Sequence, residues 1–463
     1  MRFLKTYFIA ILVLIALLYV ATFLLFIGMH IQPIGSEFSV FIGPLISSLL
    51  PVKPLDNKMS NKEFYEWFVG FCDGEGSFSV SRRKDKPSLI NFSFRIELHI
   101  KDIQVLYFIK EKLGCGTVVT SNIRNSARFA ITGPNDLINI LIPIFEKFPL
   151  NTTKYLDYKV FKEILEFYVN KMHLKTEVQQ LITDLLSNFN QSRIFFKMPS
   201  DHKINVTSYW LLGFLEGEGS FSIGKTEGRN RIKFISQFTI ALSEVNKPLL
   251  DAIKFFIDKL GTNPLCPDLD ISRCGINFRK AQSTTAKPLY ALVISDIYFI
   301  YHFFIPFING LQFLTKKELD FKDWKSGLGV LVRGLHLTEV GQSYLLELIS
   351  GMNSGRSFSN ENIHEVDSLS NKYILSTPPL YEFGPNGGIR LISNKQWVTP
   401  AKFFMLTPYS KDNELIKPLY LQGKAELCDF FALSDVTIYK YINNGQPLLS
   451  PKTQITYTIT KIF

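Results

Sequence analysis

The chain contains an internal repeat, and this repeat constrains its fold more than any other feature. Residues 67–80 read WFVGFCDGEGSFSV and residues 210–223 read WLLGFLEGEGSFSI, which is identity at nine of fourteen positions. Each segment is followed by an alternating strand pattern, by a helical segment ending in Lys-Leu-Gly, and by the words TTKYLDYK (152–159) and TKKELDFK (315–322). Such an ordered series predicts two copies of one supersecondary unit.

Each copy is expected to fold as helix, two strands, helix, two strands and helix. The first helix should begin at Ser60, because Ser60 and Glu63 have the spacing of a capping box. The strands alternate, so one face should pack on the core while the other meets solvent or a ligand. The polar faces carry Ser93, Arg95, Glu97 and His99 in the first copy, and Arg231, Lys233, Gln237 and Thr239 in the second. These residue types also suit contacts to phosphates and base edges.

Two pairs of glycines lie inside the repeated helices. Gly70 and Gly74 share one helix face, and Gly213 and Gly217 repeat the arrangement. A glycine inside a helix costs about 1 kcal/mol relative to alanine. Close approach of two helices would offset this cost, so we expect the repeated helices to pack against each other along these glycines.

Two acids end each repeated helix, Asp73 and Glu75 in the first copy and Glu216 and Glu218 in the second. A helix C-terminus disfavours negative charge, and close-packed helices would bring the four carboxylates together. A divalent cation would relieve this conflict. For Asp73 and Glu216 the alternative, acids that accept N–H bonds from the following turn, stays open.

The segments FVGFCDGEG (68–76) and LLGFLEGEG (211–219) resemble the two motifs of LAGLIDADG homing endonucleases of the single-chain type. With the closing words, the resemblance covers about residues 60–350. It implies an α+β fold of two pseudo-twofold-related αββαββα repeats whose strands form a DNA-binding saddle. It also implies site-specific cleavage of both strands of a long, semi-palindromic duplex, by a monomeric nuclease core.

The resemblance further implies roles for individual residues. The family's metal-binding acid corresponds to Glu75 and Glu218, where many members have Asp, and Gly74 and Gly217 are added as metal ligands; the cofactor is Mg²⁺ or Mn²⁺. Lys154 and Lys317, with Lys316 close behind, are candidates to polarise the attacking water or the phosphate, or else to contact DNA phosphates. The helix interface should comprise Gly70, Gly74, Gly213, Gly217, Asp73 and Glu216. The expected DNA contacts are Arg82, Arg83, Arg95, His99, Arg124, Arg128, Lys225, Arg229, Arg231, Lys233, Gln237 and Arg279.

Composition is consistent with a folded, nucleic-acid-binding body. Hydrophobic residues make up 46% of the chain, which excludes a disordered protein. There are 51 Lys+Arg against 41 Asp+Glu, an excess that favours a polyanionic partner, although it could be a dispersed solubilising charge. The sequence has no C-x-x-C and no H-E-x-x-H, so a disulfide framework or a zinc-centred enzyme is not indicated.

The N-terminal segment differs in composition from the rest of the chain. Residues 8–28 read FIAILVLIALLYVATFLLFIG, a run without charge that is long enough to span the hydrocarbon core, and Arg2 and Lys5 precede it. A cleaved signal peptide is the competing interpretation, but the run is too long and no A-x-A site follows. We therefore expect residues 1–53 to be a transmembrane-like leader translated from a membrane-protein exon.

The remaining divisions follow from these features. We expect the first repeat at 54–198, the second at 199–350, and a linker with a small helical module at 351–463, in which residues 424–445 read as a helix-turn-helix. The predicted function is an Mg²⁺-dependent, intron-encoded DNA endonuclease of a mitochondrion, fungal by its resemblance and codon bias. The alternative is an RNA maturase that binds its host intron, which needs the basic surface but not the acids.

Overall fold

Two similar αβ repeats make up most of the part of the chain that can be described. The computed structural model describes residues 59–83, 85–86, 88–228, 232–261, 274–280, 288–353, 374, 376–384, 388–399, 401–409 and 417–462. The predicted leader and its membrane span lie outside these residues. Among the helices within them, none has both the length and the apolar character that a bilayer crossing requires.

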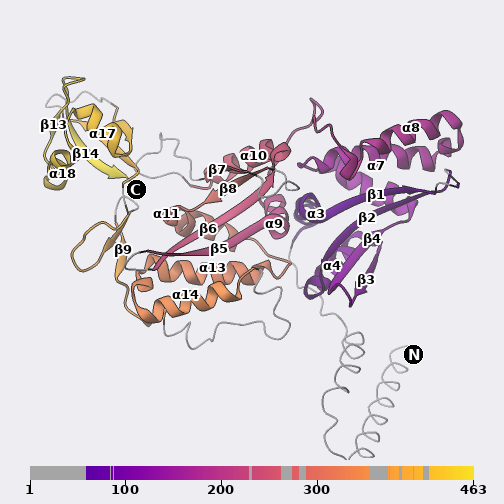
Figure 1. Ribbon diagram of the computed structural model, residues 1–463, viewed down its shortest axis with the longest axis horizontal. Coiled ribbons are helices and arrows are strands. Elements are labelled where there is room, and N and C mark those ends of the chain that lie inside the picture. Colours follow the sequence, from indigo (N-terminus) through magenta and orange to yellow (C-terminus); the bar gives the residue numbers. More distant parts are fainter. Residues whose placement is uncertain are drawn as a thin grey trace, which may run out of the picture. The chain divides into compact units, whose positions relative to one another are not determined.

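The first repeat follows the predicted order of elements and then continues (Figure 1). It comprises α3 (Asn61–Glu75), β1 (Gly76–Arg82), β2 (Ile90–His99), α4 (Ile103–Leu113), β3 (Thr117–Ser121), β4 (Ser126–Ile131), α5 (Pro134–Asp136), α6 (Ile142–Lys147), α7 (Lys154–Val169) and α8 (Thr176–Ser187). The helix that begins at TTKYLDYK, α7, and the following α8 extend the unit beyond αββαββα.

The second repeat has the same succession. It comprises α9 (Ser208–Glu218), β5 (Gly219–Glu227), β6 (Ile232–Ser243), α10 (Lys247–Asp258), β7 (Cys274–Arg279), β8 (Leu289–Ile294), α11 (Ile297–Phe299), α12 (Ile305–Asn309), α13 (Lys317–Val332) and α14 (Glu339–Gly351). The two antiparallel sheets have equivalent strand orders, β1-β2-β4-β3 and β5-β6-β8-β7. The register is equivalent as well, since Gly76 pairs with Ile96 and Gly219 with Ile240.

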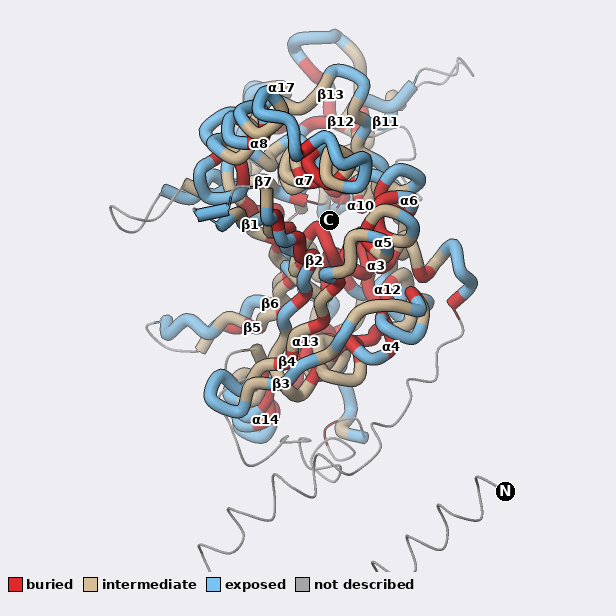
Figure 2. The backbone as a smooth tube through the Cα atoms, turned by 90° about the vertical axis from the view of Figure 1, so that its right-hand side faces the viewer, coloured by how far each residue is buried: buried red, intermediate tan, exposed pale blue. Residues whose placement is uncertain are grey.

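The sequence determines where α3 begins and which face it buries. Ser60 Oγ accepts the Glu63 amide, and the Glu63 carboxylate accepts the Ser60 amide, so the predicted capping box is present. Trp67 and Phe68 are fully buried. Figure 2 shows the buried segments gathered around α3 and the inner strands, whereas α8 is largely exposed.

The helices α3 and α9 approach each other backbone to backbone at the repeated glycines. A Cβ atom added at Gly70 would lie 2.0 Å from the Trp210 carbonyl oxygen, and one added at Gly213 would lie 2.0 Å from that of Trp67. One turn later, a Cβ atom at Gly74 or Gly217 would lie 3.3 Å from the Cα atom of the other glycine. These contacts supply the close packing that four helix glycines need.

Each repeat is closed by an asparagine after its last helix. Asn190 and Asn353 both adopt a left-handed backbone, with φ of 52°. The Asn190 amide donates to Asp157 Oδ1 over 2.9 Å, and the Asn353 amide donates to Asp320 Oδ1 over 3.0 Å. Asp157 and Asp320 are the acids of the repeated words LDYK and LDFK, so those words tie α7 and α13 to the ends of their own repeats.

The alternation of β2 is imperfect. Ser93, predicted on the polar face, is 5% exposed. Its hydroxyl oxygen accepts a 2.7 Å hydrogen bond from Arg95 Nε, so the longer side chain covers it.

The C-terminal module is not purely helical, which corrects the prediction. It contains β11 (Phe403–Pro408), β12 (Leu419–Gln422), α17 (Gly423–Phe431), α18 (Asp435–Asn444), β13 (Leu448–Leu449) and β14 (Thr456–Ile462), with strand order β12-β11-β14-β13. Two helices joined by a short turn occupy the predicted range, since Ala432 turns the chain in a left-handed conformation and Ser434 caps α18. Strand residues Phe404 and Leu406, two apart in sequence, share a separate small core with the helix residues Leu427, Phe431 and Ile438.

Substituting Gly70 with alanine should destabilise the protein strongly. The new methyl group would meet a backbone carbonyl that cannot move independently of α9, so we expect a loss of about 3 kcal/mol or more in the free energy of unfolding. Gly329→Ala is the matched control, because a Cβ atom on this helix glycine meets nothing within 4 Å and should stabilise by up to about 1 kcal/mol. Urea denaturation measures both, and equal effects would contradict the packing argument.

Candidate active site

The inner acids of the two helix ends are fully engaged in packing. Trp67 Nε1 donates to Glu216 Oε2 over 2.8 Å, and Trp210 Nε1 donates to Asp73 Oδ2 over 3.0 Å, so each repeat binds the acid of the other. Asp73 also accepts the amides of Asn151 and Thr152. These contacts place Asp73 and Glu216 in the helix interface. The amides that they accept precede α7 and α13 and do not belong to the turn after their own helices, so the capping alternative is not what the structure has.

Burial has a large effect on Glu216. It raises the pKa of this carboxyl to about 8, against the lowering effect of hydrogen bonds from the amides of Leu314 and Thr315 and from Trp67. Burial likewise raises the pKa of Asp73, opposed by its four hydrogen bonds. Removing these carboxylates from water is therefore a real cost of the interface, which the donors only partly offset.

The outer acids, Glu75 and Glu218, lie across the interface from each other's glycine. A Cβ atom at Gly217 would lie 3.4 Å from Glu75 Cγ, and one at Gly74 would lie 3.5 Å from Glu218 Cγ. Burial raises the pKa of Glu75, and the charge of Glu218 raises it further. Burial also raises the pKa of Glu218. Among the described residues, neither carboxylate accepts a hydrogen bond, so this pair differs from Asp73 and Glu216.

The predicted lysines flank this carboxylate pair. Lys154 Nζ donates to the carbonyl oxygens of Gly74 and Cys72, and Lys317 Nζ donates to that of Gly219 over 2.8 Å. Burial lowers the pKa of Lys154, opposed chiefly by the carboxylates of Asp73 and Glu218. The structure thus brings Glu75, Glu218, Lys154 and Lys317 together, each lysine fixed to a backbone carbonyl near the end of a repeated helix.

The two halves of the site are not identical. At equivalent positions, Asn246 Oδ1 accepts the Thr153 amide over 2.9 Å, whereas Asp102 Oδ1 accepts the Lys316 amide over 2.7 Å. One half therefore has a neutral pair and the other a charged pair, in which Lys316 Nζ and Asp102 Oδ2 are 4.0 Å apart. The buried Lys316 Nζ has no hydrogen-bond acceptor in the described structure.

A cavity of about 400 Å³ adjoins the charged half. Its lining includes Glu75, His99, Asp102, Lys316 and Lys317. His99 was predicted to contact DNA from the sheet surface, but its Nδ1 accepts the Lys101 amide and its ring borders this cavity. A phosphate group would bring oxygen acceptors to Lys316 in such a space.

The other predicted DNA contacts divide into three groups. Arg95, Arg124, Lys233 and Arg279 are exposed, while Arg128 and Gln237 are partly exposed. Arg83 and Lys225 are paired with Asp85 and Glu227. Arg229 and Arg231 lie outside the described residues.

Arg82, also predicted to contact DNA, is bonded within the protein. Its guanidinium donates to Gln179 O and Thr183 Oγ1 of α8, over 3.2 and 2.8 Å. The reason is strand parity, since Arg82 lies on the same side of β1 as the core residues Phe78 and Val80.

A divalent cation fits the donor set that remains. Among the described residues, no group of three or more His, Cys, Asp or Glu side chains could hold a metal ion. Mg²⁺ does not require such a group, because it binds through one or two carboxylates with waters and phosphate oxygens. Glu75 and Glu218 offer these oxygens, whereas the predicted ligand Gly74 already accepts a hydrogen bond from Lys154 through its carbonyl.

Sequence reasoning missed the tryptophans as partners of the inner acids. Trp67 precedes Asp73 by six residues, and Trp210 precedes Glu216 by the same interval. This shared spacing could have linked the tryptophans to the acids. Each tryptophan, however, donates its hydrogen bond to the acid of the opposite repeat.

Comparison with known proteins agrees with this geometry. The pattern of the LAGLIDADG endonuclease family matches residues 68–165 and 211–328, one match in each repeat. The chain belongs to the LAGLIDADG endonuclease family. Both matches include the helix end, the sheet and the start of α7 or α13, so this LAGLIDADG chain matches the family pattern twice.

Relatives and solved structures extend the comparison. An uncharacterized mitochondrial protein, RF1, of Saccharomyces cerevisiae is 26% identical over 85% of this chain and 82% of the relative. A probable intron-encoded endonuclease, Cox1-I1b, of Schizosaccharomyces pombe is 29% identical over 58% of this chain, and less than two thirds (65%) of that relative is covered. The I-LtrWI LAGLIDADG homing endonuclease bound to target DNA superposes on 64% of this chain and 99% of its own, with TM-score 0.54 and 22% identity. This likeness shows the fold.

The raised pKa of Glu216 predicts a pH-dependent stability. Between about pH 4.5 and pH 8 the folded state holds a proton that the unfolded state has released, so stability falls as pH rises through this window. We expect the wild type to lose on the order of 3–5 kcal/mol more than Glu216→Gln across it. The variant should be less stable at pH 5, because its amide cannot accept the Trp67 N–H and both backbone amides equally well.

Thermal unfolding at several pH values measures this difference. Glu318→Gln is the control, since Glu318 is only partly buried on α13 and pairs with Lys322. Parallel stability curves for the wild type and Glu216→Gln would contradict the prediction.

Proposed function

We propose that this chain is a site-specific DNA endonuclease that hydrolyses one phosphodiester bond on each strand of its target. The observation that carries the proposal is the placement of Glu75 and Glu218 at adjoining helix ends, flanked by Lys154 and Lys317. Two like charges are held together at a cost that no described hydrogen bond offsets. Such a cost is typical of functional sites.

Mg²⁺ is the cofactor that we propose for this site, held by Glu75 and Glu218. When bound, it lowers the pKa of a coordinated water and neutralises phosphate charge. A related structure, I-SmaMI, was obtained with uncleaved DNA in the presence of calcium ions, which supports a divalent site in this chain. The chain's own lysines, which flank the carboxylates, then bind the phosphate and add positive charge there.

We propose double-stranded DNA as the partner, bound by a monomeric core. The polar faces of the two sheets would each contact half of a long, semi-palindromic target, through residues such as Arg95, Arg128 and Lys233. The target-bound and cleaved-DNA complexes of related structures support this arrangement. Because one chain supplies both repeats, no second copy is needed to complete the site.

The RNA maturase alternative is less well supported. Assisting intron splicing needs a basic surface, but it does not need a carboxylate pair kept out of water. The intron-encoded names and fungal sources of the relatives, one of them mitochondrial, support a fungal mitochondrial origin for this chain.

Removing either outer carboxylate should abolish double-strand cleavage. Glu75→Gln and Glu218→Gln each delete one charge without changing side-chain size, so duplex binding should stay within about threefold while the rate of double-strand cleavage falls by at least about 10³-fold. Plasmid linearisation in Mg²⁺ and a gel-shift assay measure the two effects. Glu318→Gln is the control, because Glu318 is a partly exposed carboxylate of α13 that pairs with Lys322. Full linearisation by the double variant would sink the assignment of both residues.

Lys316 should affect the cleavage rates of the two DNA strands unequally. Its Nζ borders the cavity beside Glu75, whereas the equivalent residue of the other half is Thr153. Lys316→Met should therefore slow the cleavage of one strand by about 10-fold or more, and nicked plasmid should accumulate. Lys322→Met is the control, because Lys322 is exposed and pairs with Glu318. Equal slowing of both strands, measured with end-labelled duplex, would refute this role.

A further inference from the structure

The first sheet has a hollow of about 380 Å³ beside its second strand, β2. The hollow lies where β4 has ended, since the last pair between the two strands joins Phe94 and Ile131. Its lining includes Arg95 and five uncharged polar residues, which are Ser79, Ser81, Asn91, Ser93 and Thr132. The hollow therefore presents hydrogen-bonding groups on the surface that we propose binds duplex DNA.

Arg95 is the charged residue of this lining, and one edge of its guanidinium is fixed by the protein. Arg95 Nε donates to Ser93 Oγ over 2.7 Å, and the Ser93 side chain is buried. Within the described part of the chain, Arg95 has no carboxylate partner and makes no other side-chain hydrogen bond. Glu97, two residues along the same face, accepts a hydrogen bond from Ser126 Oγ over 2.8 Å. The two terminal nitrogens of Arg95, Nη1 and Nη2, therefore remain for a ligand.

The neighbouring strands leave room above Arg95. Its partners across the sheet are Ser77 on β1 and Ala130 on β4, both with small side chains. β2 is an inner strand, because the strand order is β1-β2-β4-β3. When a sheet lies in a groove of DNA, a side chain on an inner strand faces the base edges, whereas a turn at the end of the sheet lies closer to the phosphates. Arg95 is therefore placed to contact bases.

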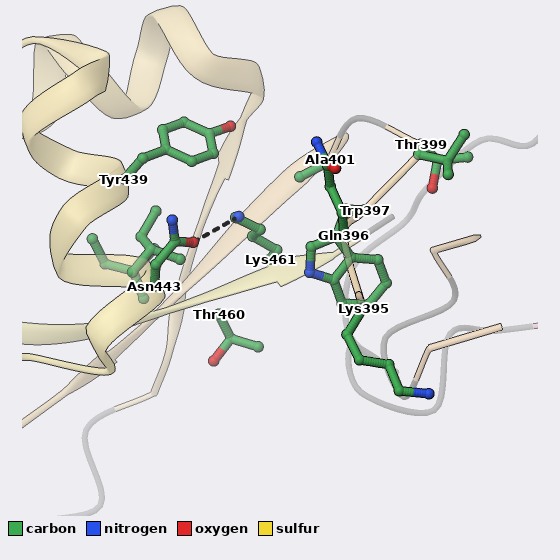
Figure 3. A pocket seen from close by; sticks show the side chains of 12 residues that line it. Lys395, Gln396, Trp397, Thr399, Ala401, Tyr439, Asn443, Thr460 and Lys461 are labelled. Carbon is green, nitrogen blue, oxygen red and sulfur yellow. Dashed lines mark hydrogen bonds between the residues drawn. The ribbon is translucent and has the colours of Figure 1, made fainter. Parts of the chain in front are cut away.

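Two lysines in a cavity of about 760 Å³ in the C-terminal part of the chain show the contrast with Arg95. Figure 3 shows Lys461 beside Asn443, to which it donates over 3.4 Å. Lys395, also in the lining, pairs with Glu382 at 2.9 Å. Arg95 is instead oriented by a neutral hydroxyl, which fixes the side chain without neutralising its charge.

The second repeat has no equivalent of this arginine. By the register of the two sheets, Thr239 occupies the position of Arg95, and Gln237 occupies the position of Ser93. Both replacements are uncharged. The two sheets therefore offer different groups to equivalent parts of a target, and the two halves of that target should differ in the base that they require there.

We propose that Arg95 reads a guanine in the half of the target bound by the first repeat, and that Ser93 positions it. This inference rests on the proposed function, because it needs a duplex target. Two parallel N–H donors of arginine match the O6 and N7 acceptors of guanine in the major groove. The bond to Ser93 holds the fork in place before binding, so less conformational freedom is lost on contact. Arg95 is thus a specificity-determining residue, and the half bound by the second repeat has no such guanine at the position facing Thr239.

Selection from a library of randomised duplexes tests the proposal. The full chain is incubated with the library in EDTA, and the bound duplexes are sequenced for the wild type and for Arg95→Gln. We expect the wild type to require one guanine that the variant does not require, while the other positions stay the same. A guanine requirement that survives in Arg95→Gln would overturn the proposal. Equal weakening of all sequences would also overturn it, because that is the result of losing a phosphate contact.

A modified base provides a second measurement. Replacing the selected guanine by 7-deazaguanine removes the N7 acceptor, so binding by the wild type should weaken by about 10-fold or more, and binding by Arg95→Gln should not change. Equal weakening of both proteins would refute the contact. Cleavage of the selected duplex in Mg²⁺ is measured separately. A duplex that is bound through this guanine but never cleaved would contradict the proposed function and leave the base contact standing.

The positioning role of Ser93 has its own variants. Ser93→Ala should lower the preference for guanine over the other bases by about 5-fold or more, without a change in melting temperature, and Ser93→Thr, which keeps the hydroxyl, should restore it. Arg124→Gln is the matched control, because Arg124 is exposed in the turn between β3 and β4, and its loss should weaken all sequences alike. Full guanine preference in Ser93→Ala would refute the role of Ser93.

Discussion

The backbone contact between α3 and α9 is the constraint on which the rest of the structure depends. Gly70 and Gly213 each face a carbonyl oxygen of the other helix at a distance that admits no side chain. This approach brings the helix ends together, and with them the two outer glutamates. It also lets the two tryptophan N–H groups reach the inner acids of the opposite repeats. Two half-sites become one site because two helices lack side chains at these positions.

Local features of the fold were predictable because their causes lie within a few residues. The Ser60–Glu63 capping box, the alternation of β6 and the cap of α18 at Ser434 all depend on neighbours in sequence. The repeat then supplied information that a single motif could not. Four interior glycines in matching positions indicated a helix contact, and the paired acids indicated a common site.

Contacts between distant segments were not predictable in the same way. Asp102 accepts the amide of Lys316, and Arg82 donates to α8, because the folded chain brings these residues together. The hydrogen bonds that end each repeat correspond to a pattern in the sequence, since Asn190-Gln-Ser-Arg and Asn353-Ser-Gly-Arg share N-x-x-R. Its meaning became clear only when the asparagines were found bonded to Asp157 and Asp320.

Positions that match between the repeats serve helix packing, whereas positions that differ change the charge of one half of the site. The glycines, tryptophans and inner acids meet one geometric requirement that applies to both helices, so each half solves it with nearly the same residues. The pair Asp102 and Lys316 belongs to one half of the site, and in the other half Asn246 and Thr153 form its neutral counterpart. In both pairs the side-chain oxygen accepts a hydrogen bond from the backbone amide of its partner. Replacing one pair by the other therefore changes the local charge and leaves the backbone arrangement intact. A symmetric scaffold can therefore hold two electrostatically different centres without a difference in fold.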